Sequence, residues 1–353
     1  MSEIVISGYY GYNNVGDELI LKSIVNDLKT LNPDITITVL SVKPKETSRK
    51  FNVKSINRYN ICSILVELVK CKMLISGSGG LFQDTTASLS LWYYLTIINI
   101  AKILNRKVFI YAVGIGGIKR SFNKFLIKSC FNKVDFISVR TDYDKNILES
   151  FMINREIIVT ADPVFGIVLP IKIKDNQQKV KKIGIIIRKT KYWKEDTEIF
   201  SKLSEILTEK PGTEVILIPF QKSSDLRILE TIKKKSNAKI SILLWENIED
   251  ILNLFSQLDL VVSMRLHGLI LAIKYNIPFV PISRYSKLIN LMKTIEEKNI
   301  LQATELNAEN IYTQITNKIS NKNDILIKNN DIIIKLENNA KKTANLCISM
   351  LTN

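Results

Sequence analysis

Short apolar runs alternate with amphipathic stretches along most of the chain. The runs are rich in Ile, Val and Leu and have the length of buried strands. In the first half they are Ile4–Ile6, Ile35–Leu40, Met73–Ile75, Val108–Ala112, Phe136–Val139 and Ile157–Val159. Segments with helical spacing lie between most of them, such as Asp17–Leu31. This alternation predicts a parallel sheet with helices on both faces.

The same pattern restarts in the second half. Around Leu169–Lys181 the sequence turns to Lys, Asp and Gln after a proline, which indicates a linker. Further strands are predicted at Ile183–Ile187, Val215–Pro219, Ile240–Leu244, Leu260–Val262 and Phe279–Ile282. We therefore predict an α/β protein with two Rossmann-like, doubly wound domains that face a cleft, residues 1–170 and 178–335. Residues 336–353 are expected to form a helix that packs back on the first domain.

The chain is strongly basic, with 50 Lys and Arg against 34 Asp and Glu and a formal net charge of +16. Such an excess favours anionic partners. A lysine-rich proteome explains the excess equally well. Scattered lysine runs such as Lys233–Lys235 fit a solvated surface better than one basic groove. No RNA- or DNA-binding motif accompanies the charge, so nucleic acid is not an expected partner.

The cysteines and the apolar stretches bear on the compartment. Four cysteines without a CxxC pair, and a single histidine far from them, predict neither a disulfide framework nor a metal site. The N-terminus lacks the layout of a signal peptide. Leu89–Leu104 is too short and too polar for a membrane span and reads as a core or interface helix, with a membrane-facing helix left open. We expect a cytoplasmic protein and leave open its association with the inner face of the membrane.

Three glycine-rich segments follow predicted strands of the first half: Ser7–Glu18, Ser76–Asp84 and Val113–Gly117. Their backbone N–H groups, and the helix N-termini beside them, favour anionic ligands. Three such loops at the strand ends of one domain would share one edge. The glycines considered as ligand-binding positions are Gly79, Gly80 and Gly116.

Polar residues next to these strands add candidate contacts. Asn13 and Asn14 offer donors and acceptors for sugar hydroxyls, and Asp17 either caps the first helix or binds ligand. Arg140 ends a strand, where it either grips a phosphate or carboxylate or forms a surface salt bridge. Asp162, before a proline, is either a turn residue or a substrate contact.

The only histidine of the chain, His267, lies in the segment Arg265-Leu266-His267 between a predicted strand and a helix. An unperturbed histidine titrates near pH 6.5, which suits proton transfer. Arg188 and Lys287 follow other strands of the same domain and are candidates for the same site.

Together, these motifs resemble the polysaccharide pyruvyl transferase family, most closely the bacterial cell-wall members of the CsaB type that pyruvylate N-acetylmannosamine. The residues that carry the resemblance are Gly8–Glu18, Gly79–Asp84, Gly114–Gly116, Val139–Arg140, Ala161–Pro163 and Arg265–His267.

The resemblance implies two domains in the GT-B arrangement, phosphoenolpyruvate as donor, a sugar hydroxyl pair as acceptor, and no metal or other cofactor. Arg140, His267 and Lys287 fall where the family's functional residues are expected, and Asn13, Asn14 and Arg188 match less closely. Family members commonly show a Tyr-Asp-x-Lys stretch, and this chain has Arg284-Tyr285-Ser286-Lys287 there, with Ser286 in place of the acid. This difference bears on the acceptor sugar more than on the reaction.

In this hypothesis Arg140, Arg265 and Lys287 neutralise phosphoenolpyruvate, and His267 either moves a proton or stabilises the phosphate electrostatically. The acceptor is a sugar of a cell-surface polysaccharide, free, polymeric or lipid-linked, and the oligomeric state stays open. Two alternatives remain at this point. One is a GT-B glycosyltransferase that uses a nucleotide sugar, and the other is a non-catalytic, glycan-binding member of an envelope assembly complex.

Overall fold

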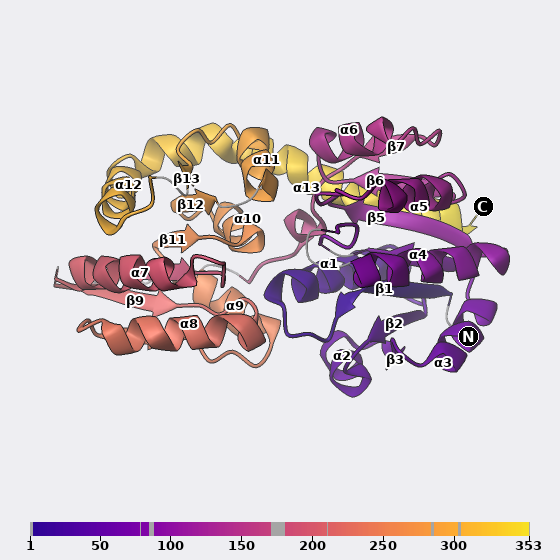
Figure 1. Cartoon of the computed structure of the whole chain (residues 1–353), viewed down its shortest axis with the longest axis horizontal. Helices are drawn as coiled ribbons and strands as arrows, with labels where there is room; N and C mark the ends of the chain where they lie inside the picture. The colour runs from indigo at the N-terminus through magenta and orange to yellow at the C-terminus, as the bar shows by residue number, and fades with distance from the viewer. Residues whose placement is uncertain are drawn as a thin grey trace. The chain divides into compact units, whose positions relative to one another are not determined.

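The computed structural model describes residues 3–77, 79–84, 88–170, 181–209, 211–283, 286–302 and 305–352, with backbone only for 286–287 and 322–330 (Figure 1). The chain divides into two compact units. Unit 1 consists of residues 1–12, 17–167 and 335–353, and unit 2 consists of residues 13–16 and 168–334.

Within the described residues, unit 1 is built on a seven-stranded parallel sheet of order β3-β2-β1-β4-β5-β6-β7. This is the Rossmann strand order with one more strand at the end. The strands are β1 (Ile4–Tyr10), β2 (Ile37–Ser41), β3 (Lys54–Asn57), β4 (Met73–Ser76), β5 (Lys107–Val113), β6 (Phe136–Val139) and β7 (Ile157–Val159). The helices are α1 (Val15–Leu31), α2 (Pro44–Phe51), α3 (Ile61–Lys70), α4 (Ser88–Ile103), α5 (Ser121–Phe131) and α6 (Asp142–Ser150), followed by the short 3-10 helix η1 (Pro163–Gly166).

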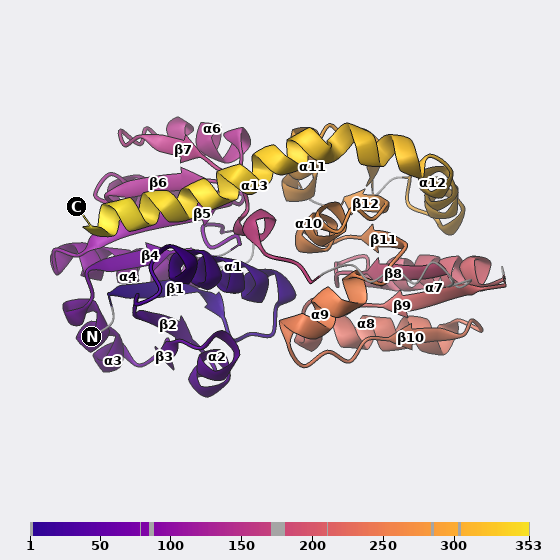
Figure 2. The same cartoon turned by 180° about the vertical axis from the view of Figure 1, so that it is seen from behind.

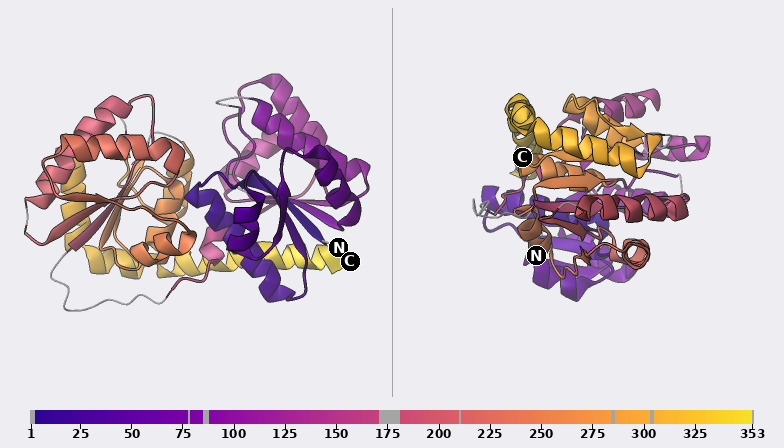
Figure 3. Two further views of the ribbon diagram at one scale, coloured as in Figure 1. Left: turned by 90° about the horizontal axis from the view of Figure 1, so that it is seen from below. Right: turned by 90° about the vertical axis from the view of Figure 1, so that its left-hand side faces the viewer.

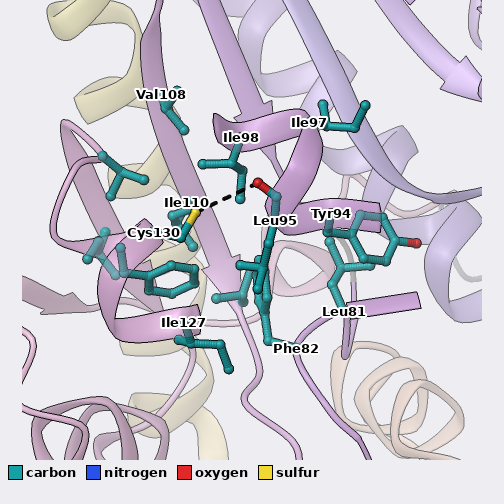
Figure 4. Packing of buried hydrophobic residues seen from close by; sticks show 14 of the residues in the cluster. Leu81, Phe82, Tyr94, Leu95, Ile97, Ile98, Val108, Ile110, Ile127 and Cys130 are labelled. Carbon is teal, nitrogen blue, oxygen red and sulfur yellow. Dashed lines mark hydrogen bonds between the residues drawn. The ribbon is translucent and has the colours of Figure 1, made fainter. Parts of the chain in front are cut away.

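Helices cover both faces of this sheet. Helices α3, α4, α5 and α6 bury their apolar sides on one face, and Figure 4 shows how α4 and α5 pack there, with the Cys130 thiol donating to the Leu95 carbonyl at 3.9 Å. On the other face lie α1 and the end of α13 (Lys322–Thr352), seen from behind in Figure 2. Cys347 of α13 contacts Met73 of β4 at 3.7 Å between the sulfur atoms.

Unit 2 repeats the plan with a parallel sheet of order β10-β9-β8-β11-β12-β13 among its described residues. Its strands are β8 (Lys181–Ile186), β9 (Thr213–Leu217), β10 (Ile240–Ile242), β11 (Leu260–Ser263), β12 (Phe279–Ser283) and β13 (Leu301–Gln302). Its helices are α7 (Trp193–Thr208), α8 (Lys222–Lys235), α9 (Ile248–Phe255), α10 (Leu266–Lys274), α11 (Ser286–Thr294) and α12 (Ala308–Ser320). Helices α7, α8 and α12 share one core with the sheet, and Figure 3 shows helices on both sides of each sheet.

The predicted fold class is confirmed: both units are doubly wound α/β domains of the Rossmann type. Each predicted apolar run overlaps a strand of the structure. Strand β3 was not predicted because its residues are exposed or half-buried and form no apolar run. The predicted linker falls mostly on residues 171–180, which lie outside the described part. Helix α13 begins at Lys322, well before residue 336, and its residues from 335 onward group with unit 1.

None of the helices in the described ranges combines the length and apolar character needed to cross a membrane.

Asp84 fixes the loop between β4 and α4. Its two carboxylate oxygens accept the backbone N–H groups of Lys119 and Arg120 at 2.8 and 2.9 Å and the side-chain amide of Asn123 at 2.9 Å. Arg120 also donates to Ser88, the first residue of α4. Burial alone would raise the pKa of Asp84, but these hydrogen bonds outweigh it and hold the pKa below its ordinary value. This carboxylate therefore joins the beginnings of α4 and α5.

We expect Asp84→Ala to lower the free energy of unfolding at pH 7 by about 3 kcal/mol, because buried donors lose their acceptor. A carboxylate with a depressed pKa stabilises the fold above its unfolded pKa of about 3.9, and this contribution is lost as the pH falls below that value. Urea denaturation at pH 7 and pH 3 measures both effects. The exposed Asp142→Ala is the matched control, and equal losses in the two variants at pH 7 would contradict the role of Asp84.

Candidate functional site

The candidate motifs of the first half meet at one edge of the unit 1 sheet. Strands β1, β4, β5, β6 and β7 are neighbours and parallel, so the segments that follow them lie at the same, carboxyl edge. The prediction that the three glycine-rich loops share an edge is therefore confirmed. From β1 the chain adds strands toward one edge of the sheet, and from β4 it adds them toward the other, so a switch point lies between β1 and β4. Ligands of doubly wound folds bind at such a switch point.

The glycines pack these loops against one another. The N–H of Gly114 donates to the carbonyl of Gly79 at 3.2 Å, and the N–H of Gly116 donates to the carbonyl of Phe82 at 2.9 Å. A Cβ atom at residue 116 would lie 2.3 Å from the Cβ of Gln83, so no larger residue fits there. Gly79 also donates to a carboxylate oxygen of Asp17 at 3.1 Å, which links the second loop to α1. Gly79 and Gly80 are half-buried.

Arg140 lies at the end of β6 and is 8% exposed. Its Nη1 forms an ion pair with Asp162, the residue before η1, and its Nε donates to the carbonyl of Ala112 at 2.7 Å. Ala112 has a φ of +43° inside an irregular stretch of β5, and its N–H donates to Ser138 Oγ at 2.8 Å. A left-handed backbone is strained for alanine and persists only where the surrounding structure holds it. Here this conformation directs the carbonyl of Ala112 toward Arg140.

Glu18 is a buried carboxyl of this edge that the sequence analysis did not single out. It is 4% exposed and accepts the N–H of Gly11 at 3.0 Å. Burial raises the pKa of Glu18 to about 7, against the opposing effect of the Gly11 hydrogen bond. The sequence does indicate that Glu18 is buried, because it lies three residues before Leu21 and seven before Val25. This spacing places it on the apolar side of α1.

The second-half candidates also meet at one edge, that of the unit 2 sheet. Arg188 follows β8, Arg265 follows β11 and Lys287 follows β12, and these strands are neighbours in the order β8-β11-β12. The switch point of this sheet lies between β8 and β11. Arg188 is exposed, and the side chain of Lys287 lies outside the described part of the structure.

Arg265 is held by Asp225, a residue of α8 that the sequence analysis missed. One guanidinium nitrogen contacts both carboxylate oxygens at 2.6 and 2.7 Å, and Asp225 is completely buried. Asp225 also accepts the N–H of Gln221 at 2.9 Å. The sequence indicates the burial of Asp225 in the same way as for Glu18. It lies on the apolar side of its helix, at helical spacing from Ile228 and Ile232.

His267 is half-buried in the first turn of α10 and contacts the first glycine-rich motif. Residues 13–16 group with unit 2, where Asn14 pairs with Gln221 and the N–H of Val15 donates to the Phe220 carbonyl at 2.8 Å. A Cβ atom at residue 16 would lie 2.2 Å from Nδ1 of His267. Only glycine at this position leaves the imidazole where it is.

The two asparagines differ in what they do. Asn14 accepts the N–H of Gly16 through its side-chain oxygen at 3.0 Å, at the beginning of α1, and Asn13 has a left-handed φ of +54°. Both are half-buried. Asn14 therefore caps α1, a role that was one of the two alternatives predicted for Asp17.

The structure thus forms two clusters. Unit 1 brings together Asp17, Gly79, Gly116, Arg140 and Asp162, and unit 2 brings together Asn13, Asn14, Arg265 and His267. In the described ranges, no group of three or more His, Cys, Asp or Glu side chains is placed to hold a metal ion.

We expect Glu18→Gln to stabilise the protein above pH 7 by at most about 3 kcal/mol. A carboxyl whose pKa is raised on folding loses stability as the pH rises from its unfolded pKa to its folded pKa, and a neutral amide does not. The difference in free energy of unfolding between Glu18→Gln and the wild type should become small near pH 4.5. Thermal unfolding at pH 8 and pH 4.5 measures it, with the exposed Glu149→Gln as control. A destabilised Glu18→Gln at pH 8 would contradict the raised pKa.

The fold is shared with a protein solved in complex with UDP and with UDP-GlcNAc 2-epimerases. Anabaena HepE in complex with UDP matches with a TM-score of 0.67 at 11% identity, over 100% of both chains. The UDP-GlcNAc 2-epimerase of Neisseria meningitidis, bound to UDP-GlcNAc, matches with 0.62 at 14% identity over 100% of both chains. The UDP-GlcNAc 2-epimerase of Methanocaldococcus jannaschii matches with 0.63 at 15% identity, over 98% of this chain and 99% of that one. At such low identity, these likenesses show the fold alone.

Sequence comparison identifies the family. No curated protein sequence matches the chain significantly. The profile of one family, polysaccharide pyruvyl transferase, matches residues 14–286 and so covers most of the chain and, apart from Asn13, both clusters. The chain belongs to the polysaccharide pyruvyl transferase family.

Proposed function

We propose that the protein transfers a pyruvyl group from phosphoenolpyruvate to two hydroxyls of one sugar, in a cell-surface polysaccharide or its lipid-linked precursor, and releases phosphate. The observation that carries the proposal is the first turn of α10. At the switch point of unit 2, this turn carries the only histidine of the chain, two residues after Arg265, whose guanidinium a buried aspartate orients. A helix N-terminus of this kind favours an anionic ligand.

The reaction balances with hydroxyl groups and phosphoenolpyruvate alone. One sugar oxygen bonds to C2 of the donor while C3 gains a proton and becomes a methyl group. The second sugar oxygen then bonds to C2, and the bond from C2 to the phosphate oxygen breaks. Of the two protons lost by the hydroxyls, the equivalent of one resides on C3 and that of the other leaves with phosphate. The product is a cyclic ketal, and no redox cofactor is needed.

The chain's own residues would supply charge and proton transfer. Arg140 and Arg265 each already face a buried carboxylate, so they present oriented N–H donors while much of their charge is compensated. The remaining negative charge of phosphoenolpyruvate therefore falls to Lys287, Arg188 and the N-terminus of α10. His267 moves a proton between the hydroxyls, C3 and the phosphate.

Sugar and donor contacts complete the assignment. Asn13 and Asn14 are the candidates for the sugar hydroxyls, and the N–H groups of Gly79, Gly80 and Gly116 are candidates for donor oxygens. We expect Asp17 and Asp162 to act by holding Gly79 and Arg140, whose contacts they make. The reaction needs no metal in this proposal.

The direct experiment incubates the protein with phosphoenolpyruvate and a panel of free and lipid-linked N-acetylhexosamine acceptors. We expect phosphate release that depends on the acceptor, and a product heavier by one pyruvyl ketal. A nucleotide sugar in place of phosphoenolpyruvate should give no product. Release of a nucleoside diphosphate with sugar transfer would instead establish a glycosyltransferase, and no product with any acceptor would favour a glycan-binding protein.

His267→Gln keeps the size and hydrogen bonding of the side chain but cannot carry a proton. We expect turnover to fall by about 10²–10⁴-fold while the apparent KM for phosphoenolpyruvate changes little. Steady-state phosphate release measures both, and an unchanged unfolding midpoint serves as the folding control. Near-normal turnover would contradict the proton-transfer role.

The Arg140–Asp162 pair allows a matched test of donor binding. Removing Arg140 alone would leave a buried carboxylate without compensation, so we compare Arg140→Gln/Asp162→Asn with Asp162→Asn. The double variant should raise the KM for phosphoenolpyruvate by at least about tenfold, the cost of one charge-assisted hydrogen bond. Asp162→Asn leaves the arginine charge uncompensated and should lower the KM or leave it unchanged. A double variant with wild-type KM would remove Arg140 from the donor site.

A further inference from the structure

Helices α4 and α5 expose large apolar side chains on the side that faces away from the sheet. Their inner sides pack in the core, as Figure 4 shows for Leu95, Ile98 and Ile127. Exposed single hydrophobics are ordinary, but a contiguous set marks an interaction surface. The exposed set on these two helices is Leu89 (72% exposed), Trp92 (40%), Ile103 (79%), Phe122 (60%) and Phe125 (63%).

Three of these side chains line one hollow between the two helices. Its volume is about 720 Å³, and Trp92, Ile103 and Phe122 line it together with the half-buried Leu126. The indole N–H of Trp92 donates to Asn123 of α5 at 2.9 Å, which ties the two helices across the hollow. We call this surface the α4–α5 face.

The segment that contains α4 and α5 carries positive charge without any acidic residue. Residues 85–134 contain no Asp or Glu, whereas they contain eight basic residues: Lys102, Arg106, Lys107, Lys119, Arg120, Lys124, Lys128 and Lys133. Half of the formal net charge of the chain, +8 of +16, therefore lies in one seventh of its length. Lys102 and Lys133 line the hollow, and Asp135 offsets part of this charge through a 2.7 Å ion pair with Lys102. This concentration argues against a uniformly lysine-rich composition as the cause.

We propose that the α4–α5 face docks on the surface of an anionic phospholipid bilayer. Aromatic and aliphatic side chains on a basic surface are the features of segments that lie in the interface of a membrane, with the rings among the headgroups and the lysines at the anionic phosphates. A second copy of the chain fits less well, since a two-fold interface would bring this positive surface against itself.

Docking would bring the bilayer next to the unit 1 edge. Helix α4 follows the loop 79–84 and α5 follows the loop 114–117, and Asp84 joins the beginnings of both helices. Leu89, Trp92, Phe122 and Phe125 all lie in the first turns of these helices. A sugar acceptor carried on a membrane lipid would thus be presented near the glycine-rich loops. The docking itself does not depend on the proposed reaction.

The test is cosedimentation of the full chain with vesicles. We expect binding to vesicles of phosphatidylcholine with about one third phosphatidylglycerol to be at least tenfold tighter than to pure phosphatidylcholine, and to weaken with salt. Phe122→Ser/Phe125→Ser and, separately, Lys124→Glu/Lys133→Glu should each weaken it at least about tenfold. Lys233→Glu/Lys234→Glu on α8 changes the net charge equally and should alter binding less than about threefold.

A second readout keeps the test independent of these variants. Brominated phospholipids should quench tryptophan fluorescence in the wild type and much less in Trp92→Phe, which keeps an aromatic ring at the position. Absence of vesicle binding by the wild type would overturn the proposal, as would equal losses in the α8 control. A concentration-dependent dimer that Phe122→Ser/Phe125→Ser abolishes would instead assign the face to a second copy of the chain.

Discussion

Everything in the candidate site follows from one constraint, the parallel alignment of the strands in each sheet. Parallel strands place all their carboxyl ends at the same edge, so residues far apart in sequence become neighbours. In unit 1 this brings the loop after β1, near residue 11, to the same edge as Asp162 after β7. In unit 2 it brings Arg188 and Arg265 to the two sides of one switch point. Helices cover both faces of each sheet, so the central strands are buried and their carboxyl ends are where ligands reach them.

A second theme is that two of the candidate arginines, Arg140 and Arg265, each pair with a buried acid. Arg140 pairs with Asp162 and Arg265 with Asp225, and both carboxylates are almost completely buried. A buried ion pair adds little net stability, because desolvation offsets most of the attraction, but it fixes the guanidinium plane. Such arginines are suited to orient a carboxylate or phosphate rather than to supply its full counter-charge. The left-handed backbone of Ala112 costs stability but directs its carbonyl to Arg140. The glycine at residue 16 likewise leaves room for the imidazole of His267.

Much of this could be predicted from the sequence, and the rest fails for identifiable reasons. Apolar runs located the buried strands, because burial on both faces demands continuous hydrophobicity. Strand β3 was not predicted because it lies at the edge of the sheet, where its residues need not be apolar. Arg140, Arg265 and His267 stood out by their place after strands. Asp162 was also a candidate, but Asp225 was missed, because its pairing with Arg265 depends on how α8 packs. The only sequence signal for Asp225 was an acidic residue on the apolar face of a helix.

The central claim is that this chain makes a ketal from phosphoenolpyruvate, and the reaction run in deuterated water tests it most directly. The methylene carbon of the donor must take up one proton to become the methyl group of the ketal. The account therefore predicts a product whose methyl group carries one solvent deuterium, formed in step with phosphate release. A product without deuterium in that methyl group, or phosphate release without any pyruvylated sugar, would contradict it.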